Sequence, residues 1–296
     1  MFQPRRTNTG NFRSAVNFFE LVYHSVVRSV RKQHNNAFAA IGINILQAVI
    51  FVGVFYVMFS VLGMRGAAIR GDFVIYIMTG IFLFMVHTKT VAAVAAAEGP
   101  ASAMMKHAPM TTMIALAAAA LGALYIQMLS LILIMSVYHL AFNPVVIYDP
   151  SGVMFMLMIA WFTGVAVGMV LLAIKPWAPA FTQIFTTIYQ RANMIASGKM
   201  FLANSLPSFM LAMFDWNPLF HVIDQARGYA FINYNPRYSN WEYAVWVGVV
   251  LMVIGLMGEF YTRKHASASW SARRLWKCVS FGRFIRATAR MSMPEG

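Results

Sequence analysis

The chain has 296 residues, of which 60% are hydrophobic and only 11% are charged, and its formal net charge is +14. Soluble domains contain about 45–50% apolar and about 25% charged residues. The composition therefore excludes a disordered chain and argues against a single soluble domain. One cysteine, Cys278, excludes an intramolecular disulfide and a cysteine-rich metal site.

Six apolar stretches are long enough for a transmembrane helix, which needs about 20 residues to cross a hydrocarbon core of about 30 Å. The fifth is the weakest because polar residues interrupt it at 190–193. Most connections between the stretches are short. We predict an all-α integral membrane protein with six transmembrane helices, at residues 33–64, 73–97, 112–140, 151–174, 178–200 and 243–262.

The connection between the fifth and sixth stretches is longer than the others. Residues 199–242 contain short apolar pieces broken by Pro207, Pro218 and Pro236. Each piece is too short to cross a membrane, so we expect short re-entrant or interfacial helices whose backbone is buried against protein.

Basic residues indicate the orientation, because cytoplasmic loops of membrane proteins are enriched in Lys and Arg. With both termini in the cytoplasm, 16 basic residues lie on the inner side and 5 on the outer side, and Lys89 and Arg191 lie within spans. The positive charge is then an orientation signal, and we expect no nucleic-acid partner.

We expect three parts in the chain. Residues 1–36 form a cytoplasmic segment, in which 15–32 have the pattern of a basic amphipathic helix lying in the membrane interface. Residues 37–262 form the transmembrane domain, and 263–296 form a basic cytoplasmic tail.

Motifs for catalysis and for ATP binding are absent. The sequence has no GxxxxGK[ST] phosphate loop, no HExxH and no GxSxG, and its histidines do not cluster at metal-ligand spacing. We therefore predict no catalytic residue, no metal ligand and no cofactor bound by this chain. An intramembrane enzyme would have to pair His87 or His139 with a serine, and a histidine packed in a helix is the simpler interpretation.

Polar residues within the apolar stretches are candidates for a substrate path. A charge at the depth of Arg191 costs at least about 2.5 kcal/mol unless it is paired or hydrated. We predict that Arg191, with its neighbours Tyr189, Gln190 and Asn193, lines a hydrated path for a polar or anionic substrate. The alternatives are an ion pair with a carboxylate or an early end of the helix. Lys89 is a weaker candidate, because it could extend to the inner interface.

A polar string follows in the connection before the last span. It contains Asn217, Pro218, His221, Asp224 and Arg227. Asp224 and Arg227 are three residues apart and share one helix face, which favours a structural role unless the helix forms part of a gate.

Together these features resemble the membrane subunit of an ABC-2 type exporter. The NPxxHxIDxxR string at 217–227 resembles the subgroup that exports capsular polysaccharide and related lipid-linked glycans, and the likeness covers residues 15–262. The resemblance implies an inner-membrane homodimer with two copies of a separate ATPase that binds ATP and Mg²⁺. It further implies a lipid-linked polysaccharide as cargo, and periplasmic and outer-membrane proteins that continue the route in Gram-negative relatives.

The resemblance also implies two functional regions. The inner loop 98–110 would contact the ATPase, with Glu98, Gly99, Lys106 and His107 as the coupling residues, and the polar string at 217–227 would belong to an outer gate. Two alternatives remain open. One is an ABC-2 permease for O-antigen, a teichoic-type polymer or a drug, and the other is an ATP-independent channel or an intramembrane enzyme.

Overall fold

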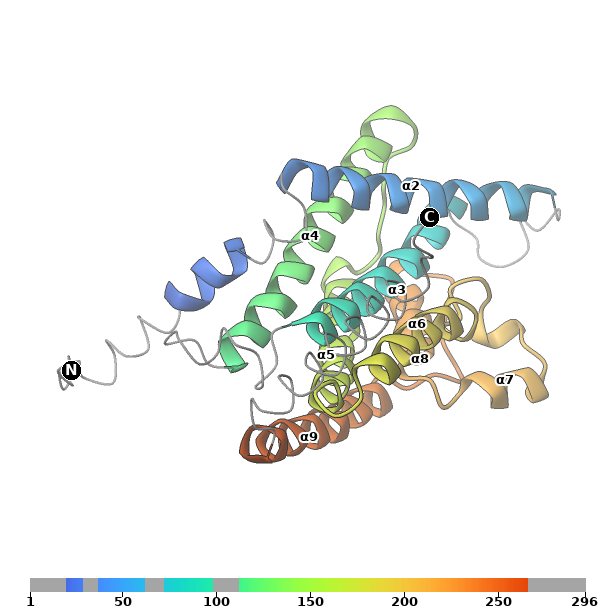
Figure 1. Cartoon of the computed structure of the whole chain (residues 1–296). Coiled ribbons are helices and arrows are strands. Elements are labelled where there is room, and N and C mark those ends of the chain that lie inside the picture. The colour runs from blue at the N-terminus through green and yellow to red at the C-terminus, as the bar shows by residue number, and fades with distance from the viewer. Residues whose placement is uncertain (1–19, 29–36, 62–71, 98–111, 266–296) are drawn as a thin grey trace, which may run out of the picture.

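The computed structural model describes residues 20–28, 37–61, 72–97 and 112–265, and the regular structure in these ranges is helical throughout (Figure 1). This confirms the all-α prediction. The labelled elements are α2 (Ala37–Val61), α3 (Phe73–Ala96), α4 (Thr112–Ala141), α5 (Pro150–Ile174), α6 (Pro179–Ala196), η2 (Ala203–Ser205), α7 (Ser208–Phe214), α8 (Pro218–Ala230) and α9 (Trp241–His265).

Four of these helices, α3, α4, α5 and α9, are long and apolar enough to cross a membrane. The chain is thus a helical membrane protein by length and composition. The other two expected spans, α2 and α6, do not meet the same criterion of length and hydropathy. The described apolar part of α2 is only Gly42–Met58, and α6 is an 18-residue helix rich in polar residues.

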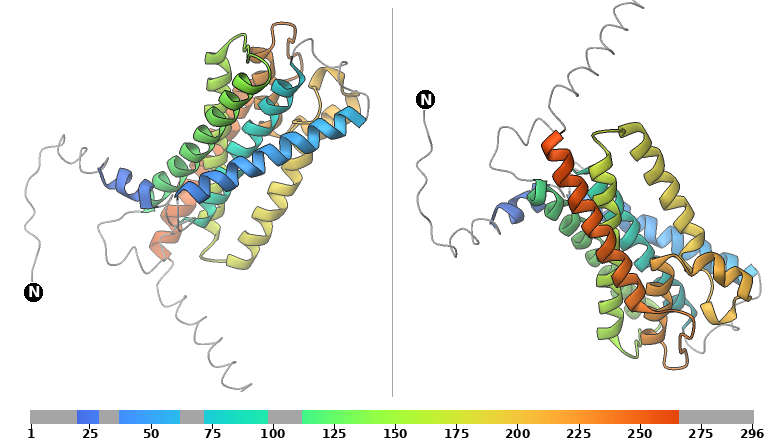
Figure 2. Two further views of the ribbon diagram at one scale, coloured as in Figure 1. Left: turned by 90° about the horizontal axis from the view of Figure 1, so that it is seen from above. Right: turned by 90° about the horizontal axis from the view of Figure 1, so that it is seen from below.

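The centre of the bundle is α5, which packs between α3 and α9 (Figure 2). Small residues allow the close approach. A Cβ atom on Gly164 would lie 2.8 Å from the carbonyl oxygen of His87 on α3, and one on Gly248 of α9 would lie 2.7 Å from the ring of Phe162. The residue numbers of the contacting positions rise together along the three helices, so α3, α5 and α9 run in the same direction.

The remaining long helices run the opposite way. On α2, Gln47 bonds Lys89 and Tyr56 packs on Phe73, so α2 is antiparallel to α3. On α4, Thr112 bonds Glu259 near the end of α9, whereas the other end of α4 reaches the start of α3. Helix α6 begins just after the end of α5 and finishes beside α8.

Polar groups cap the helices at both ends of the bundle. At what we call the Asp72 end, Asp72 accepts a hydrogen bond from Val74 N at the start of α3, and Asp149 accepts from Ser151 N and Gly152 N at the start of α5. At the opposite end, which we call the Lys175 end, Lys175 Nζ donates to the last carbonyls of α3, at Ala95, Ala96 and Ala97. Cations are favourable at a helix C-terminus.

The connection after α6 forms a small helical subregion at the Asp72 end. Residues 197–240 contain η2, α7 and α8, and α8 packs on α3, α5 and α9. None of these helices exceeds 13 residues, which agrees with the expectation of pieces too short to cross.

The described part of the N-terminal segment is a helix at 20–28. Val22 is buried, whereas Glu20, His24 and Arg28 are exposed. The rest of that segment, the coupling loop 98–110 with Glu98, Gly99, Lys106 and His107, and the tail beyond His265 lie outside the described residues.

Candidate functional site

A chain of polar contacts joins α6 to the middle of α3. His87 of α3 is fully buried, and its Nε2 lies 2.9 Å from the Tyr189 hydroxyl on α6. Its Nδ1 lies 3.1 Å from both the carbonyl of Ala160 and the hydroxyl of Thr163 on α5. Because His87 is about 21 Å from the start of α3 and about 14 Å from its end by helix rise, this polar group lies deep in the bundle.

The polar residues that flank Arg191 all turn toward protein. Gln190 Nε2 donates to the carbonyl of Thr88 at 3.2 Å, and Tyr189 bonds His87. Asn193 is buried and accepts a hydrogen bond from Asn217. These three predicted path residues therefore attach α6 to the rest of the molecule.

Arg191 points the other way. Its side chain is exposed, and no described residue forms an ion pair or a hydrogen bond with it. The ion-pair alternative for Arg191 is therefore not observed within the described part of the chain. Arg191 lies in a stripe of exposed apolar residues with alternating spacings of three and four, at Phe181, Ile184, Ile188 and Ile195.

Lys89 is half-buried and is not isolated. Its Nζ donates to Oε1 of Gln47 on α2 at 2.7 Å. Lys89 directly follows Thr88, to which Gln190 is bonded. The structure thus brings Gln190 to the position next to Lys89 on α3, whereas Arg191 faces outward. The string at 217–227 connects to α6 through Asn217 and Asn193.

Asn217 and Pro218 start α8 and connect it to the end of α6. Asn217 Oδ1 accepts from Leu219 N as the helix N-cap, and Pro218 occupies the first turn, where no backbone N–H is needed. The Asn217 amide nitrogen donates to Asn193 Oδ1 and to the carbonyl of Ala196. One side chain therefore caps α8 and binds the last turn of α6.

His221 connects α8 to the segments on either side. Its Nε2 lies 2.7 Å from the carbonyl of Asp215, and its Nδ1 accepts from Asn240 N at 3.1 Å. The bond from Asn240 requires an unprotonated Nδ1, so Nε2 carries the proton and donates to Asp215. His221 is thus a buried link between the turn before α8 and the start of α9.

Asp224 is buried and accepts from three segments of the subregion. Its donors are Ala203 N, the Tyr234 hydroxyl and the Ser239 hydroxyl, the last at 2.7 Å. Burial and the nearby Asp224 carboxylate raise the pKa of Tyr234. The phenol therefore stays protonated and remains a donor.

Arg227 is fully buried and does not pair directly with Asp224. Its guanidinium donates to three backbone carbonyls, those of Gly198, Lys199 and Phe201, at 2.9, 2.6 and 2.6 Å. The guanidinium carbon also lies 4.3 Å from the ring centroid of Tyr76. The sequence suggested a shared helix face for the two residues, and both bind the segment at 198–203, Asp224 through the backbone N–H of Ala203 and Arg227 through the three carbonyls.

The sequence analysis missed Lys199, which it counted among the residues on the outer side. Lys199 is only 4% exposed, and its Nζ lies 3.7 Å from the ring centroid of Phe84 on α3 and 5.3 Å from those of Phe51 and Phe55 on α2. No hydrogen-bond partner for Nζ occurs among the described residues. Its position at the outer end of the fifth expected span suggested a cation at the outer surface, and no local signal indicated the three phenylalanines that enclose it.

The enzyme alternative required a serine beside His87 or His139. The hydrogen-bonding partners observed for His87 are Ala160, Thr163 and Tyr189. His139 Nδ1 accepts from Val145 N at the end of α4. Neither arrangement contains a nucleophilic serine among the described residues, and no group of three potential metal ligands occurs there.

The fold and these contacts define a helical membrane protein with a buried polar layer between α3 and α6 and a polar subregion centred on α8. In comparisons with known proteins, no family model and no curated protein matches the chain.

Proposed function

We propose that this chain is the membrane subunit of an ATP-driven exporter of the ABC-2 type, and that it moves a polysaccharide across the bacterial inner membrane as a homodimer. The observation that carries the proposal is Arg191, a cation on the outward stripe of α6 with no described partner. The likeness of the string at 217–227 to glycan exporters supplies the substrate class.

Six membrane crossings account for the packing directions. Helices α5 and α9 are long enough to cross and run in the same direction, so the chain must return to the Asp72 end between them. Helix α6 is the long helix in that stretch, and its 18 residues rise about 27 Å. In the same way, α2 runs opposite to α3. The proposal assigns both helices as crossings and both termini to the cytoplasm.

A second copy of the chain would cover the outward stripe of α6. In lipid, an unpaired arginine at this depth is costly. A two-fold assembly is the usual way for a protein to enclose such a surface, and the two copies of Arg191 would then line a hydrated route between the subunits. An acidic glycan or a phosphate-linked lipid carrier would be attracted to these cations.

The subregion at 197–240 has a different part in the proposal. Asn217, His221, Asp224 and Arg227 are engaged in contacts within the protein. They would maintain the shape of the outer end of the route rather than bind cargo. Movement of this subregion as a unit would open that end.

Affinity purification of the chain in mild detergent tests the proposal. We expect a separate ABC ATPase to co-purify in equal amount, together with a lipid-linked glycan detected by carbohydrate staining. Two copies of this chain should be present in the complex. Purification of a monomer that transports cargo without an ATPase would contradict the proposal.

A further inference from the structure

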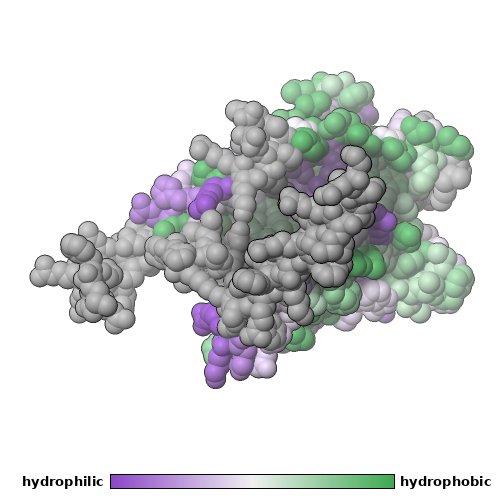
Figure 3. Space-filling view, viewed as in Figure 1, coloured by the Kyte–Doolittle hydropathy of each residue, from purple (hydrophilic) through white to green (hydrophobic). Residues whose placement is uncertain are grey.

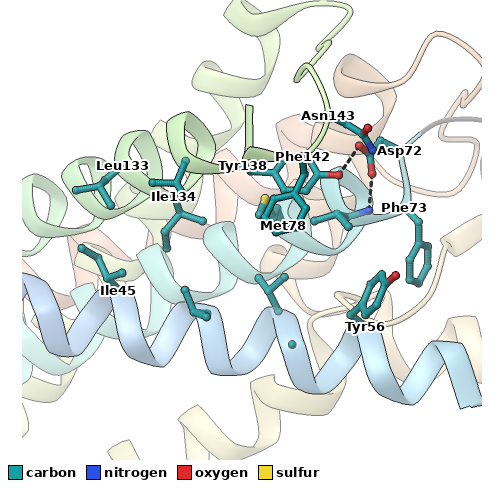
Figure 4. Close-up of a pocket in the computed structure, with 15 residues that line it drawn as sticks. Ile45, Tyr56, Asp72, Phe73, Met78, Leu133, Ile134, Tyr138, Phe142 and Asn143 are labelled. Carbon is teal, nitrogen blue, oxygen red and sulfur yellow. Dashed lines mark hydrogen bonds between the residues drawn. The ribbon is translucent and has the colours of Figure 1, made fainter. Parts of the chain in front are cut away.

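A cavity of about 780 Å³ lies between α2, α3 and α4, away from the polar layer at α6 (Figure 4). Its walls are almost entirely apolar, with Ile45, Met78 and Ile134 among the residues that form them. Exposed apolar side chains of α2 and α4 surround the cavity, among them Leu46, Ile50 and Val137, and hydrophobic residues predominate at the adjacent end of α4 in Figure 3. The size is within the range of about 300–1,000 Å³ that is usual for ligand sites.

The cavity has one polar end. Figure 4 shows Asp72, Tyr138 and Asn143 together at one end and Ile45 and Leu133 at the other. Asp72 is the only charged residue among the described residues that line the cavity. Its carboxylate accepts from Val74 N at 2.9 Å and from the Tyr138 hydroxyl at 2.6 Å, which leaves acceptor positions for a further donor.

The length of the cavity matches one leaflet of a membrane. From Ile45 to Tyr56 the wall formed by α2 extends about 16 Å by helix rise, and half of a hydrocarbon core of about 30 Å is about 15 Å. The polar end coincides with the ends of α3 and α4, where the membrane surface would lie. The apolar end then lies near the bilayer midplane.

The chemistry of the walls indicates the occupant. An apolar groove with one acidic end complements flexible acyl chains that carry a cationic headgroup. A helix of a second copy is the competing occupant, and the cross-linking test below distinguishes it from a lipid.

We propose that this cavity is a binding site for one phospholipid with a cationic amine headgroup. The acyl chains occupy the groove between α2 and α4, and the headgroup ammonium lies beside the Asp72 carboxylate. The site selects a zwitterionic, amine-bearing lipid such as phosphatidylethanolamine over anionic phosphatidylglycerol, because the one charged residue among the described wall residues is negative. The inference requires the membrane location of the helices and is independent of the exported cargo.

Native mass spectrometry tests the site on full-length chain taken from vesicles with equal amounts of phosphatidylethanolamine and phosphatidylglycerol. We expect one retained phosphatidylethanolamine per chain, preferred at least fivefold over phosphatidylglycerol. Asp72→Asn keeps an oxygen to cap α3 and should abolish the preference. Asp149→Asn is the matched control, because Asp149 also caps a helix but does not line the cavity, and it should behave like the unmodified chain.

Filling the cavity provides a second, independent test. A Cβ atom on Gly53 would meet nothing within 4 Å, so the backbone admits a side chain there, and Gly53→Phe should occupy the groove and remove the retained lipid. Val49→Trp, at another wall position, guards against a folding defect specific to one variant. Equal lipid retention in two folded filling variants and the unmodified chain would overturn the proposal. An Asp72→Asn variant that keeps its headgroup preference would also overturn it. A cross-link between two copies through a cysteine at position 49 would overturn it as well, because it would place a second copy at the groove.

Discussion

The Asn217 amide nitrogen donates to Asn193 Oδ1 at 3.0 Å, which joins the start of α8 to the last turn of α6. Because Asn217 Oδ1 also caps α8, two helices depend on one side chain. Asn193 in turn donates to the carbonyl of Tyr189, whose hydroxyl bonds His87. A continuous set of hydrogen bonds thus connects the subregion at 197–240 to the middle of α3.

Substitution of Asn217 should separate its two functions. Asn217→Ser can still cap α8 but cannot reach α6, whereas Asn217→Ala loses both contacts. Loss of an N-cap costs about 1 kcal/mol, and each hydrogen bond to α6 is worth about 0.5–1.5 kcal/mol. We therefore expect the thermal midpoint in detergent to fall in the order unmodified chain, Asn217→Ser, Asn217→Ala. Asn233→Ala changes an exposed residue nearby and should have no effect. A midpoint for Asn217→Ala equal to that of Asn233→Ala would contradict this account.

Arg227 should be necessary for a folded subregion. Arg227→Met keeps much of the side-chain volume but removes the guanidinium from three carbonyl groups, of which Gly198 O keeps a bond from Phe201 N. Each unsatisfied buried group costs about 1–3 kcal/mol, so the amount of folded protein in the membrane should fall sharply. Arg227→Lys should recover only part of it, since an ammonium does not reproduce the planar fork.

The control for Arg227 is Arg237→Met, which changes an exposed arginine of the same subregion. Abundance can be followed by fluorescence-detected size exclusion of tagged protein. Normal abundance of Arg227→Met would show that the carbonyls of residues 198–201 do not need the guanidinium.

Cysteine labelling of intact cells should distinguish four crossings from six. In a Cys278→Ser background, Ala180→Cys lies at the start of α6 and Tyr238→Cys lies in the exposed segment before α9. If α6 crosses the membrane, an impermeant maleimide should label position 238 and not position 180. Permeabilised cells provide the control for reactivity at position 180. Labelling of both positions from outside would show that α6 does not cross.

Arg191 should affect transport without affecting folding. Its side chain is exposed and forms no ion pair or hydrogen bond with the described residues that Arg191→Ala would break. We expect the variant to accumulate normally, while export falls by tenfold or more and Arg191→Lys recovers part of it. Ile195→Ala, on the same outward stripe, measures the effect of altering the surface without removing charge. Loss of the Arg191→Ala protein from the membrane would indicate a structural role instead.

The sequence predicted the long helices more accurately than the contacts between them. Apolar runs alone placed α3 and α5 to within one residue at each end, because an apolar run is a local signal, and the structure shows Asp72 and Asp149 as their N-caps. For α6 the prediction extended to residue 200, whereas the helix ends at Ala196. Its end is fixed by Asn217 and Arg227, which are distant in sequence and left no local signal.

The sequence identified the polar residues of the candidate site but not the direction in which each side chain points. The sequence singled out the polar residues at 189–193, but only the structure separates the outward Arg191 from the inward Tyr189, Gln190 and Asn193. Burial of Lys199 depends on Phe51, Phe55 and Phe84, which lie more than a hundred residues earlier in the chain. Contacts of that separation are not encoded in a local pattern.

The central claim is that this chain provides a route and a separate ATPase provides the energy. Proteoliposomes that contain the chain with and without its co-purified ATPase test this directly, with a fluorescent lipid-linked glycan supplied on the ATPase side. The account predicts that glycan becomes protected from an external glycosidase only when both the ATPase and ATP are present. Protection at the same rate without ATPase or without ATP would contradict it.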